Sequence, residues 1–245
     1  MNKNVEAVPS QTRTAVARSS RNRQRAAVKS VPVIDLSSYL ASGRETARQA
    51  TAMEIRNACI DVGFFYLSGH GFPDGELEEA VEWGHRFFNL PLEVKMRFAA
   101  RDAGGTGFVR VGGLNPAGQT SADVKERYII TRNTRPDGGD GSHWPDDDVL
   151  PGFATFMKQH LSRRVSLAKC LVQAFARSLD LPETYFDPYY RNLSYNSIIN
   201  YYPPLDAATV KNNRWSFSPH TDYGGFTLLS QDSLGGLQVC NSAGE

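Results

Sequence analysis

Two residues near the carboxyl end of the chain have the types and the spacing needed to bind a metal ion. They are His220 and Asp222, separated by Thr221. If this stretch is a β-strand, both side chains leave the same face, with Cα atoms roughly 6.5–7 Å apart. An imidazole nitrogen and a carboxylate oxygen are two of the three ligands in a two-His-one-carboxylate Fe(II) site. The sequence therefore makes His220 and Asp222 candidate metal ligands.

The tripeptide by itself also fits a simpler interpretation. A His and an Asp on the solvated end of a strand have the same spacing without any metal between them. A third imidazole would have to come from elsewhere, and the other histidines are His70, His85, His143 and His160. We expect each of these to be a structural or surface histidine, as most isolated histidines are.

The elements that must position these residues change in type along the chain. Apolar residues recur at helical spacing through most of the first 190 residues, with short apolar runs typical of strands between them. This pattern predicts helices at 44–61, 76–89, 91–98 and 153–179, and strands at 31–36, 64–67 and 125–131. A glycine-rich loop is expected at 101–121.

After residue 190 the composition favours short strands. Residues 193–202 alternate β-branched and aromatic residues with polar ones, which predicts a strand that Pro203 and Pro204 end. Further strands are expected around His220, at 226–231 and at 237–240. The sequence thus predicts an α+β protein with a helical front part and the beginning of a β-sandwich or barrel.

Composition excludes several classes of protein. The net charge of +1, with 40% apolar and 22% charged residues, is typical of a soluble globular protein and gives no general attraction to nucleic acid. No apolar run approaches the roughly 20 residues that span a bilayer. The cysteines Cys59, Cys170 and Cys240 are scattered and odd in number, which favours reduced thiols and a cytoplasmic location.

The first 30 residues differ from the rest. They hold seven Lys and Arg residues against one acid, Glu6, and no aromatic residue. Such a stretch cannot bury enough apolar surface to offset the entropy lost on ordering, so we expect a disordered basic tail. An organelle transit peptide and a nucleic-acid-binding arm are the alternatives.

Several motifs, taken together and in this order, resemble those of one family. The order matters because each motif is short and common by itself. The motifs are VPVIDL at Val31–Leu36, GFFYLSGHGF at Gly63–Phe72, FFNLP at Phe87–Pro91, NYYPP at Asn200–Pro204, His220-Thr221-Asp222, GFTLLSQD at Gly225–Asp232 and GGLQV at Gly235–Val239. Over about Val31 to Glu245 the sequence thus resembles isopenicillin N synthase-like iron(II)/2-oxoglutarate-dependent oxygenases.

The resemblance implies a fold and a domain organisation. The fold would be a helical N-terminal region followed by a double-stranded β-helix of jelly-roll type, here incomplete. The expected divisions are a disordered tail at 1–30, a non-haem dioxygenase N-terminal region at 31–140, a linker turn and long core helix at 141–190, and the start of the oxygenase jelly roll at 191–245.

The resemblance also implies a set of cofactors. His220 and Asp222 would be the first two Fe(II) ligands, and Asn200 and Tyr202 would contact 2-oxoglutarate, the co-substrate used with O₂. For Asn200 and Tyr202, packing and hydrogen bonding on a strand face is the alternative. The reaction would oxidise an unactivated C–H bond of a small organic substrate by hydroxylation, desaturation or cyclisation. No residue is assigned here as catalytic, and the oligomeric state stays open.

The family pattern includes a distal His and an Arg-x-Ser pair several tens of residues beyond Asp222. The sequence ends at Glu245, so we expect a C-terminally truncated oxygenase that is inactive as this fragment. Two alternatives remain. One is an oxidase of the isopenicillin N synthase type, which works without 2-oxoglutarate, and the other is a non-catalytic remnant or binding protein.

Overall fold

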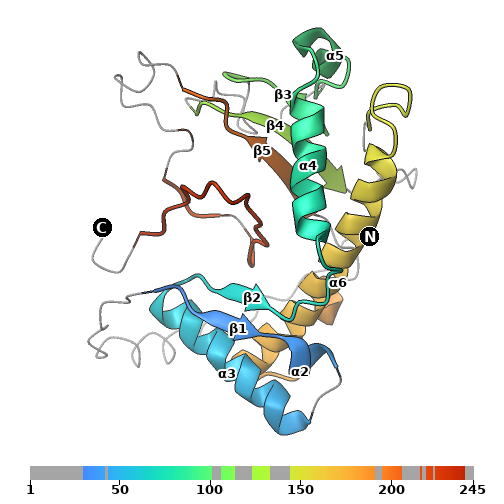
Figure 1. The fold of residues 1–245 in the computed structure, drawn as a ribbon. Helices are drawn as coiled ribbons and strands as arrows, with labels where there is room; N and C mark the ends of the chain where they lie inside the picture. Colours follow the sequence, from blue (N-terminus) through green and yellow to red (C-terminus); the bar gives the residue numbers. More distant parts are fainter. Residues whose placement is uncertain are drawn as a thin grey trace, which may run out of the picture.

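The long helix α6 (Phe153–Ser178) connects two packed halves of the molecule (Figure 1). The computed structural model describes residues 30–41, 44–100, 106–113, 123–132, 144–190, 195–205, 216, 219–222 and 224–240. The N-terminal half of α6 packs into one hydrophobic cluster and its C-terminal half into another. The basic tail expected at 1–30 lies outside the described residues, apart from Ser30.

The first half combines a two-stranded parallel sheet with two helices. Strands β1 (Val33–Asp35) and β2 (Tyr66–Ser68) pair in register, so that Val33 lies opposite Tyr66. Helices α2 (Ser37–Leu40) and α3 (Glu45–Asp61) follow β1. Helix α3 buries Ala52, Ile55 and Ala58, whose spacing places them on one helical face. That face and the buried residues of β1 pack against α6.

The second half places helix α4 (Glu76–Phe88) on a three-stranded antiparallel sheet (Figure 1). Its strands are β3 (Gly107–Val109), β4 (Glu126–Arg132) and β5 (Tyr195–Tyr201), in that order, and the short helix α5 (Leu92–Met96) follows α4. Gly84 lets α4 approach the sheet closely, since a Cβ there would lie 3.2 Å from Ile199 Cγ2.

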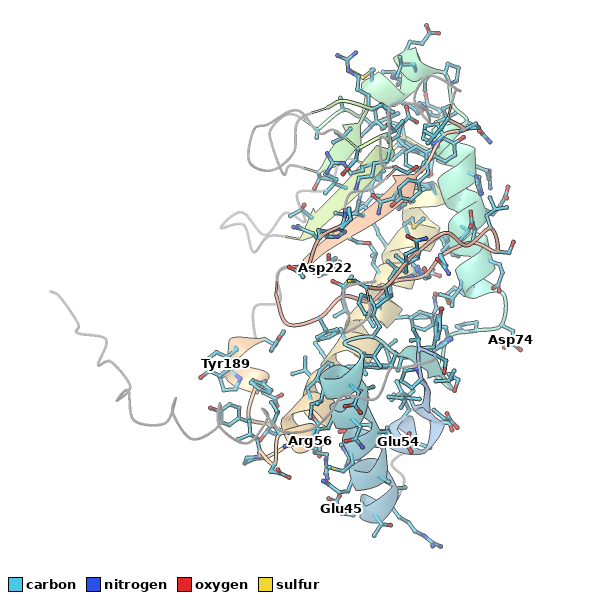
Figure 2. The ribbon with its side chains drawn as sticks, turned by 90° about the vertical axis from the view of Figure 1, so that its left-hand side faces the viewer. Glu45, Glu54, Arg56, Asp74, Tyr189 and Asp222 are labelled. Carbon is cyan, nitrogen blue, oxygen red and sulfur yellow. The ribbon has the colours of Figure 1, made fainter. Side chains whose placement is uncertain are left out.

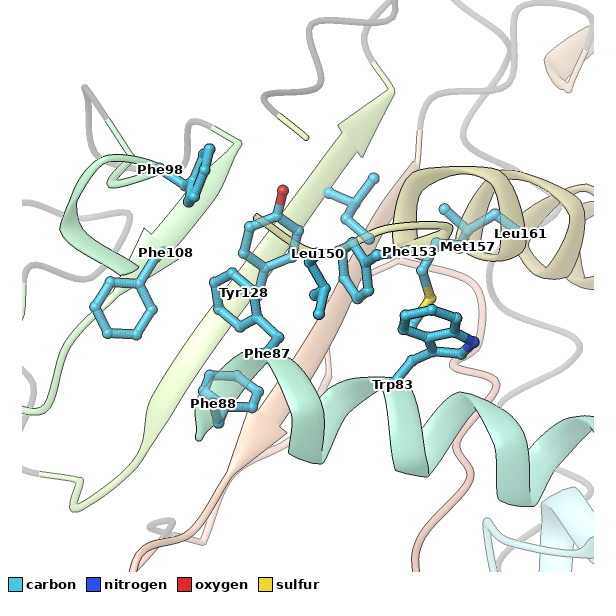
Figure 3. Close-up of a cluster of buried hydrophobic side chains, with 11 residues drawn as sticks. Trp83, Phe87, Phe88, Phe98, Phe108, Tyr128, Leu150, Phe153, Met157 and Leu161 are labelled. Atoms are coloured by element: carbon cyan, nitrogen blue, oxygen red, sulfur yellow. The ribbon is translucent and has the colours of Figure 1, made fainter. Parts of the chain in front are cut away.

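An aromatic cluster fills the space between α4, the sheet and α6 (Figure 3). Phe87 is fully buried, with its ring centroid 4.6 Å from that of Tyr128 and 5.9 Å from that of Phe153. A buried ion pair borders the cluster, because Lys95 Nζ lies 2.7 Å from Glu126 Oε2 and also donates to the Phe88 carbonyl. This core covers one face of the three-stranded sheet, and the side chains of the opposite face point away from it.

The structure confirms the predicted helices and the strands at β1, β2, β4 and β5 to within two or three residues. Two expectations are wrong. Residues 107–109 form β3 inside the expected glycine-rich loop, and residues 219–222, 226–231 and 237–240 are not strands. A strand requires a hydrogen-bonded neighbour, and among the described residues none pairs with these segments.

The α+β class is confirmed, whereas the jelly roll stays a prediction, because the described strands form two small separate sheets. The 3₁₀ helix η2 (Asp187–Tyr189) follows α6 along the chain. Cys59, Cys170 and Cys240 form no disulfide. None of the described helices combines the length and apolar character that crossing a membrane requires.

Candidate metal site

His220 and Asp222 converge, although the segment that carries them is not a strand. His220 Nε2 lies 3.2 Å from Asp222 Oδ1, and both side chains are about half exposed. In the view of Figure 2, Asp222 lies at the lower end of the three-stranded sheet, away from Glu45, Glu54 and Arg56 of helix α3. The structure therefore brings the two predicted ligands together on an accessible part of the surface.

The distance between these two atoms suits a shared ion. Two ligand atoms bonded to a metal at about 2.1 Å and at right angles lie about 3.0 Å apart. The observed separation of 3.2 Å is close to this value. An imidazole nitrogen with a carboxylate oxygen is also the donor pair that non-haem Fe(II) sites use. The two residues fit an iron site in which further ligands complete the coordination.

A third protein ligand is not found in the part of the chain that the structure describes. No cluster of three His, Cys, Asp or Glu side chains exists among those residues. His70 Nδ1 accepts a hydrogen bond from the Phe72 amide, and the His85 ring packs on Tyr201. His160 is 4% exposed and pairs with Glu76. Each of these three histidines thus has a contact with another side chain or with the backbone, and His143 lies outside the described residues.

The backbone after Asp222 has restricted geometry. Gly224 has a φ of +92°, a conformation that side-chain-bearing residues rarely adopt. At Gly225 a Cβ would lie 3.1 Å from the hydroxyl oxygen of Tyr190. The two glycines therefore have different roles: Gly224 allows a left-handed backbone, and Gly225 allows a close approach to a tyrosine.

Asn200 and Tyr202 lie at the end of β5, on the side of the sheet away from the aromatic core. Side chains alternate along β5, so that Ile199 and Tyr201 face the core while Asn200 is exposed. Asn200 is opposite Arg127 of β4. Tyr202 is 45% exposed, and its pKa is raised by burial and by the nearby Asp123 carboxylate. Its phenol therefore stays protonated and can donate a hydrogen bond.

Charged residues that sequence analysis did not single out lie on this same side. Lys125 Nζ is 3.5 Å from Asp123 Oδ2, and burial lowers the Lys125 pKa to about 8 although Asp123 opposes the shift. Burial also lowers the pKa of Arg127. Lys125 and Arg127 alternate with core-facing residues, a pattern that could have flagged a charged face on the predicted strand.

Two family models match the chain. Residues 31–147 match the model described as non-haem dioxygenase in morphine synthesis N-terminal, and residues 194–245 match that of the 2OG-Fe(II) oxygenase superfamily. The second match contains both predicted metal ligands and both residues proposed to contact 2-oxoglutarate. The first match ends before the second begins, so the two models cover separate parts of the chain.

Similar proteins include the 2-oxoglutarate-dependent dioxygenase ecdK of Aspergillus rugulosus, 31% identical, with 81% of this chain and 64% of that protein covered. The proline hydroxylase buaE of Petromyces alliaceus is 32% identical, covering 84% of this chain and 66% of that protein. A full-length Neurospora crassa protein, solved by crystallography in complex with alpha-KG, is 30% identical, with a TM-score of 0.77 and coverage of 88% of this chain and 68% of that one. A second crystal structure of the same Neurospora protein contains thymine as well. The chain thus spans about two thirds of the length of these relatives.

Proposed function

Because the chain belongs to the 2OG-Fe(II) oxygenase superfamily, we propose that the protein is a non-haem Fe(II), 2-oxoglutarate-dependent oxygenase. The observation that carries the proposal is the convergence of His220 and Asp222, whose ligand atoms are 3.2 Å apart within the segment that matches the superfamily model. The reaction is oxidation of an unactivated C–H bond in a small organic substrate by hydroxylation, desaturation or cyclisation.

Each of the four site residues has a role in this proposal. His220 and Asp222 hold the iron, which with 2-oxoglutarate and O₂ supplies the oxidising chemistry. Asn200 and Tyr202 contact 2-oxoglutarate from the end of β5. Two observations support this role. Asn200 and Tyr202 lie on the side of the sheet away from the core, and the phenol of Tyr202 stays protonated and can donate a hydrogen bond to a carboxylate.

The names of the relatives support a small polar substrate. One relative is named as a proline hydroxylase, and a related structure contains thymine beside alpha-KG. Both molecules are small enough to bind beside an iron site at the end of a sheet. We propose a substrate of this size, and leave its identity to the assay.

The decisive test is iron-dependent turnover in the longest natural form of the protein. We expect iron content near one per molecule and consumption of 2-oxoglutarate with O₂. Replacing both ligands, His220→Ala with Asp222→Ala, should abolish both. Unchanged iron content and O₂ consumption in the double variant would refute the proposal. Turnover that continues without 2-oxoglutarate would instead favour an oxidase of the isopenicillin N synthase type.

A second test needs only the coding sequence. Transcripts that extend beyond the codon for Glu245 are expected to encode a His followed by an Arg-x-Ser pair, which would supply the third iron ligand and a partner for the far carboxylate of 2-oxoglutarate. A continuation that lacks both would favour a non-catalytic remnant or binding protein.

A further inference from the structure

Arg164 of helix α6 binds the segment that follows the two metal-ligand residues. Its NH1 group donates to the carbonyl oxygen of Leu228 at 3.2 Å, and its NH2 group donates to Ser230 Oγ at 2.6 Å. Residues 226–230 are not part of a sheet, so contacts of this kind must hold the segment in place. Hydrogen bonds from a charged donor are stronger than those between neutral groups.

A ring contact fixes the other end of the same segment. The Phe226 ring centroid is 5.2 Å from that of Phe175, which is also on α6. From residue 164 to residue 175 is about 16 Å along a helix, and four residues of extended chain cover about 13 Å. The two spans are similar, so residues 226–230 run along α6 in the opposite direction.

Only three residues separate Asp222 from Phe226. Two of them are the glycines described above, one with a positive φ and the other close to the Tyr190 hydroxyl. Because each residue spans at most about 3.6 Å, a connection this short keeps Asp222 close to Phe226. The docking of residues 226–230 on α6 therefore limits where His220 and Asp222 can lie.

The Arg164 side chain is itself held by a buried relay. Its Nε donates to His160 Nε2 at 2.7 Å, and His160 Nδ1 lies 2.7 Å from Glu76 Oε1 at the start of α4. His160 and Glu76 are 4% and 5% exposed. Arg163 pairs with the other Glu76 oxygen at 3.0 Å. The relay orients the Arg164 guanidinium toward residues 226–230.

We propose that Arg164 is a positioning residue, which holds residues 226–230 on α6 and thereby fixes the relative placement of His220 and Asp222. The part that concerns the metal rests on the proposed function. Arg164 acts on the two ligand residues through its hydrogen bonds to Leu228 and Ser230.

Hydrogen exchange of the 245-residue chain tests the docking without any metal. Arg164→Gln should raise the amide exchange rates of residues 220–222 and 224–232 about tenfold. Arg163→Gln is the matched control, because Arg163 is the neighbouring arginine and pairs with Glu76, whereas Arg164 donates to Leu228 and Ser230. This variant should leave the exchange rates within about twofold of wild type. Ser230→Ala, in an exposed residue, should raise them about threefold and serves if Arg164→Gln fails to fold.

Titration of the longest natural form of the protein with Co(II), as a stand-in for Fe(II), tests the consequence for the site, because the third ligand is expected beyond Glu245. Arg164→Gln should weaken Co(II) binding about fivefold, and Arg163→Gln should not. Equal exchange rates in the two Arg variants would overturn the proposal, as would faster exchange with unchanged Co(II) affinity. If the longest natural form binds no Co(II), the proposed function is contradicted, and amide exchange at residues 220–222 decides alone. Faster exchange in Arg164→Gln then supports the positioning role, and unchanged exchange overturns it.

Discussion

At the scale of single residues, His160 shows how burial selects one protonation state. Arg164 can only donate, so His160 Nε2 must accept, and the proton lies on Nδ1, facing Glu76. Burial lowers the His160 pKa, the nearby Arg164 and Arg163 add to this effect, and Glu76 opposes it. The neutral form is therefore the one that fits the relay between α4 and α6.

This geometry predicts a loss of stability in mild acid. The unfolded chain binds a proton at His160 near pH 6.5, whereas the folded chain does so only at lower pH. The unfolded state then binds more protons, so the free energy of unfolding should fall as the pH drops below about 6.5. Urea denaturation at pH 7.5, 6.5 and 5.5 measures this, and His160→Gln should flatten the dependence. If the free energy of unfolding of His160→Gln fell with pH as steeply as that of wild type, His160 would not be the group responsible.

Lys125 gives a second prediction at this scale. Its pKa of about 8 should appear in a ¹³C-lysine NMR titration as a Cε signal whose midpoint lies well below 10.5, the ordinary value for a lysine. Because Asp123 raises the Lys125 pKa, Asp123→Asn should lower the titration midpoint further. A Lys125 Cε signal with a midpoint near 10.5 would show that the side chain is well solvated.

At the scale of elements, the contact between α4 and the sheet depends on Gly84, which has no side chain. Gly84 faces Ile199, and the aromatic cluster packs around this close approach. Glycine in a helix interior costs about 1 kcal/mol relative to alanine, so close packing offsets a propensity cost here. The distance between the helix and the sheet is therefore set by the absence of a Cβ atom.

Gly84→Val should accordingly destabilise the protein by about 1–3 kcal/mol through overpacking against Ile199. Glu82→Val, at an exposed site in the same helix, controls for the helix propensity of valine. Adding Ile199→Ala should recover part of the loss, because the two residues are in contact and their effects couple. Chemical denaturation of the three variants measures this, and equal losses in Gly84→Val and Glu82→Val would contradict the packing explanation.

At the scale of the whole molecule, α6 joins two cores that would otherwise be separate. An ion-pair network strengthens the first half: Arg177 pairs with Glu45 and Glu183, and Arg48 pairs with Glu183. Large apolar side chains nevertheless stay exposed on the outer face of the β1–β2 sheet. Val33 is 65% exposed and Tyr66, its partner in register, is 57% exposed. Exposed apolar patches on small sheets promote association.

We therefore predict that Val33→Thr combined with Tyr66→Thr reduces concentration-dependent light scattering of the 245-residue chain, while its Tm changes by only a few degrees. Ile34→Thr, at the adjacent position with 2% exposure, should instead lower the Tm sharply because it buries a hydroxyl. Scattering that is unchanged in the double variant would show that association uses another surface.

The sequence determined the helices, the first strands and the closeness of His220 and Asp222, because these depend on local patterns. The spacing of apolar residues places α3, α4 and α6, and the two-residue separation of His220 and Asp222 lets a nitrogen and an oxygen lie 3.2 Å apart. Strand β3 was missed because a three-residue strand in a glycine-rich stretch forms only when β4 supplies its hydrogen bonds.

Only the tertiary structure decided how the candidate metal site is supported. Arg164 and Leu228 are 64 residues apart in sequence, as His160 and Glu76 are 84 apart, and no local pattern pairs them. Likewise the burial that lowers the Lys125 pKa comes from the packing of distant segments. Residue types and spacing specify what a site can bind, whereas packing between distant segments specifies where the site lies and which charges its surroundings tolerate.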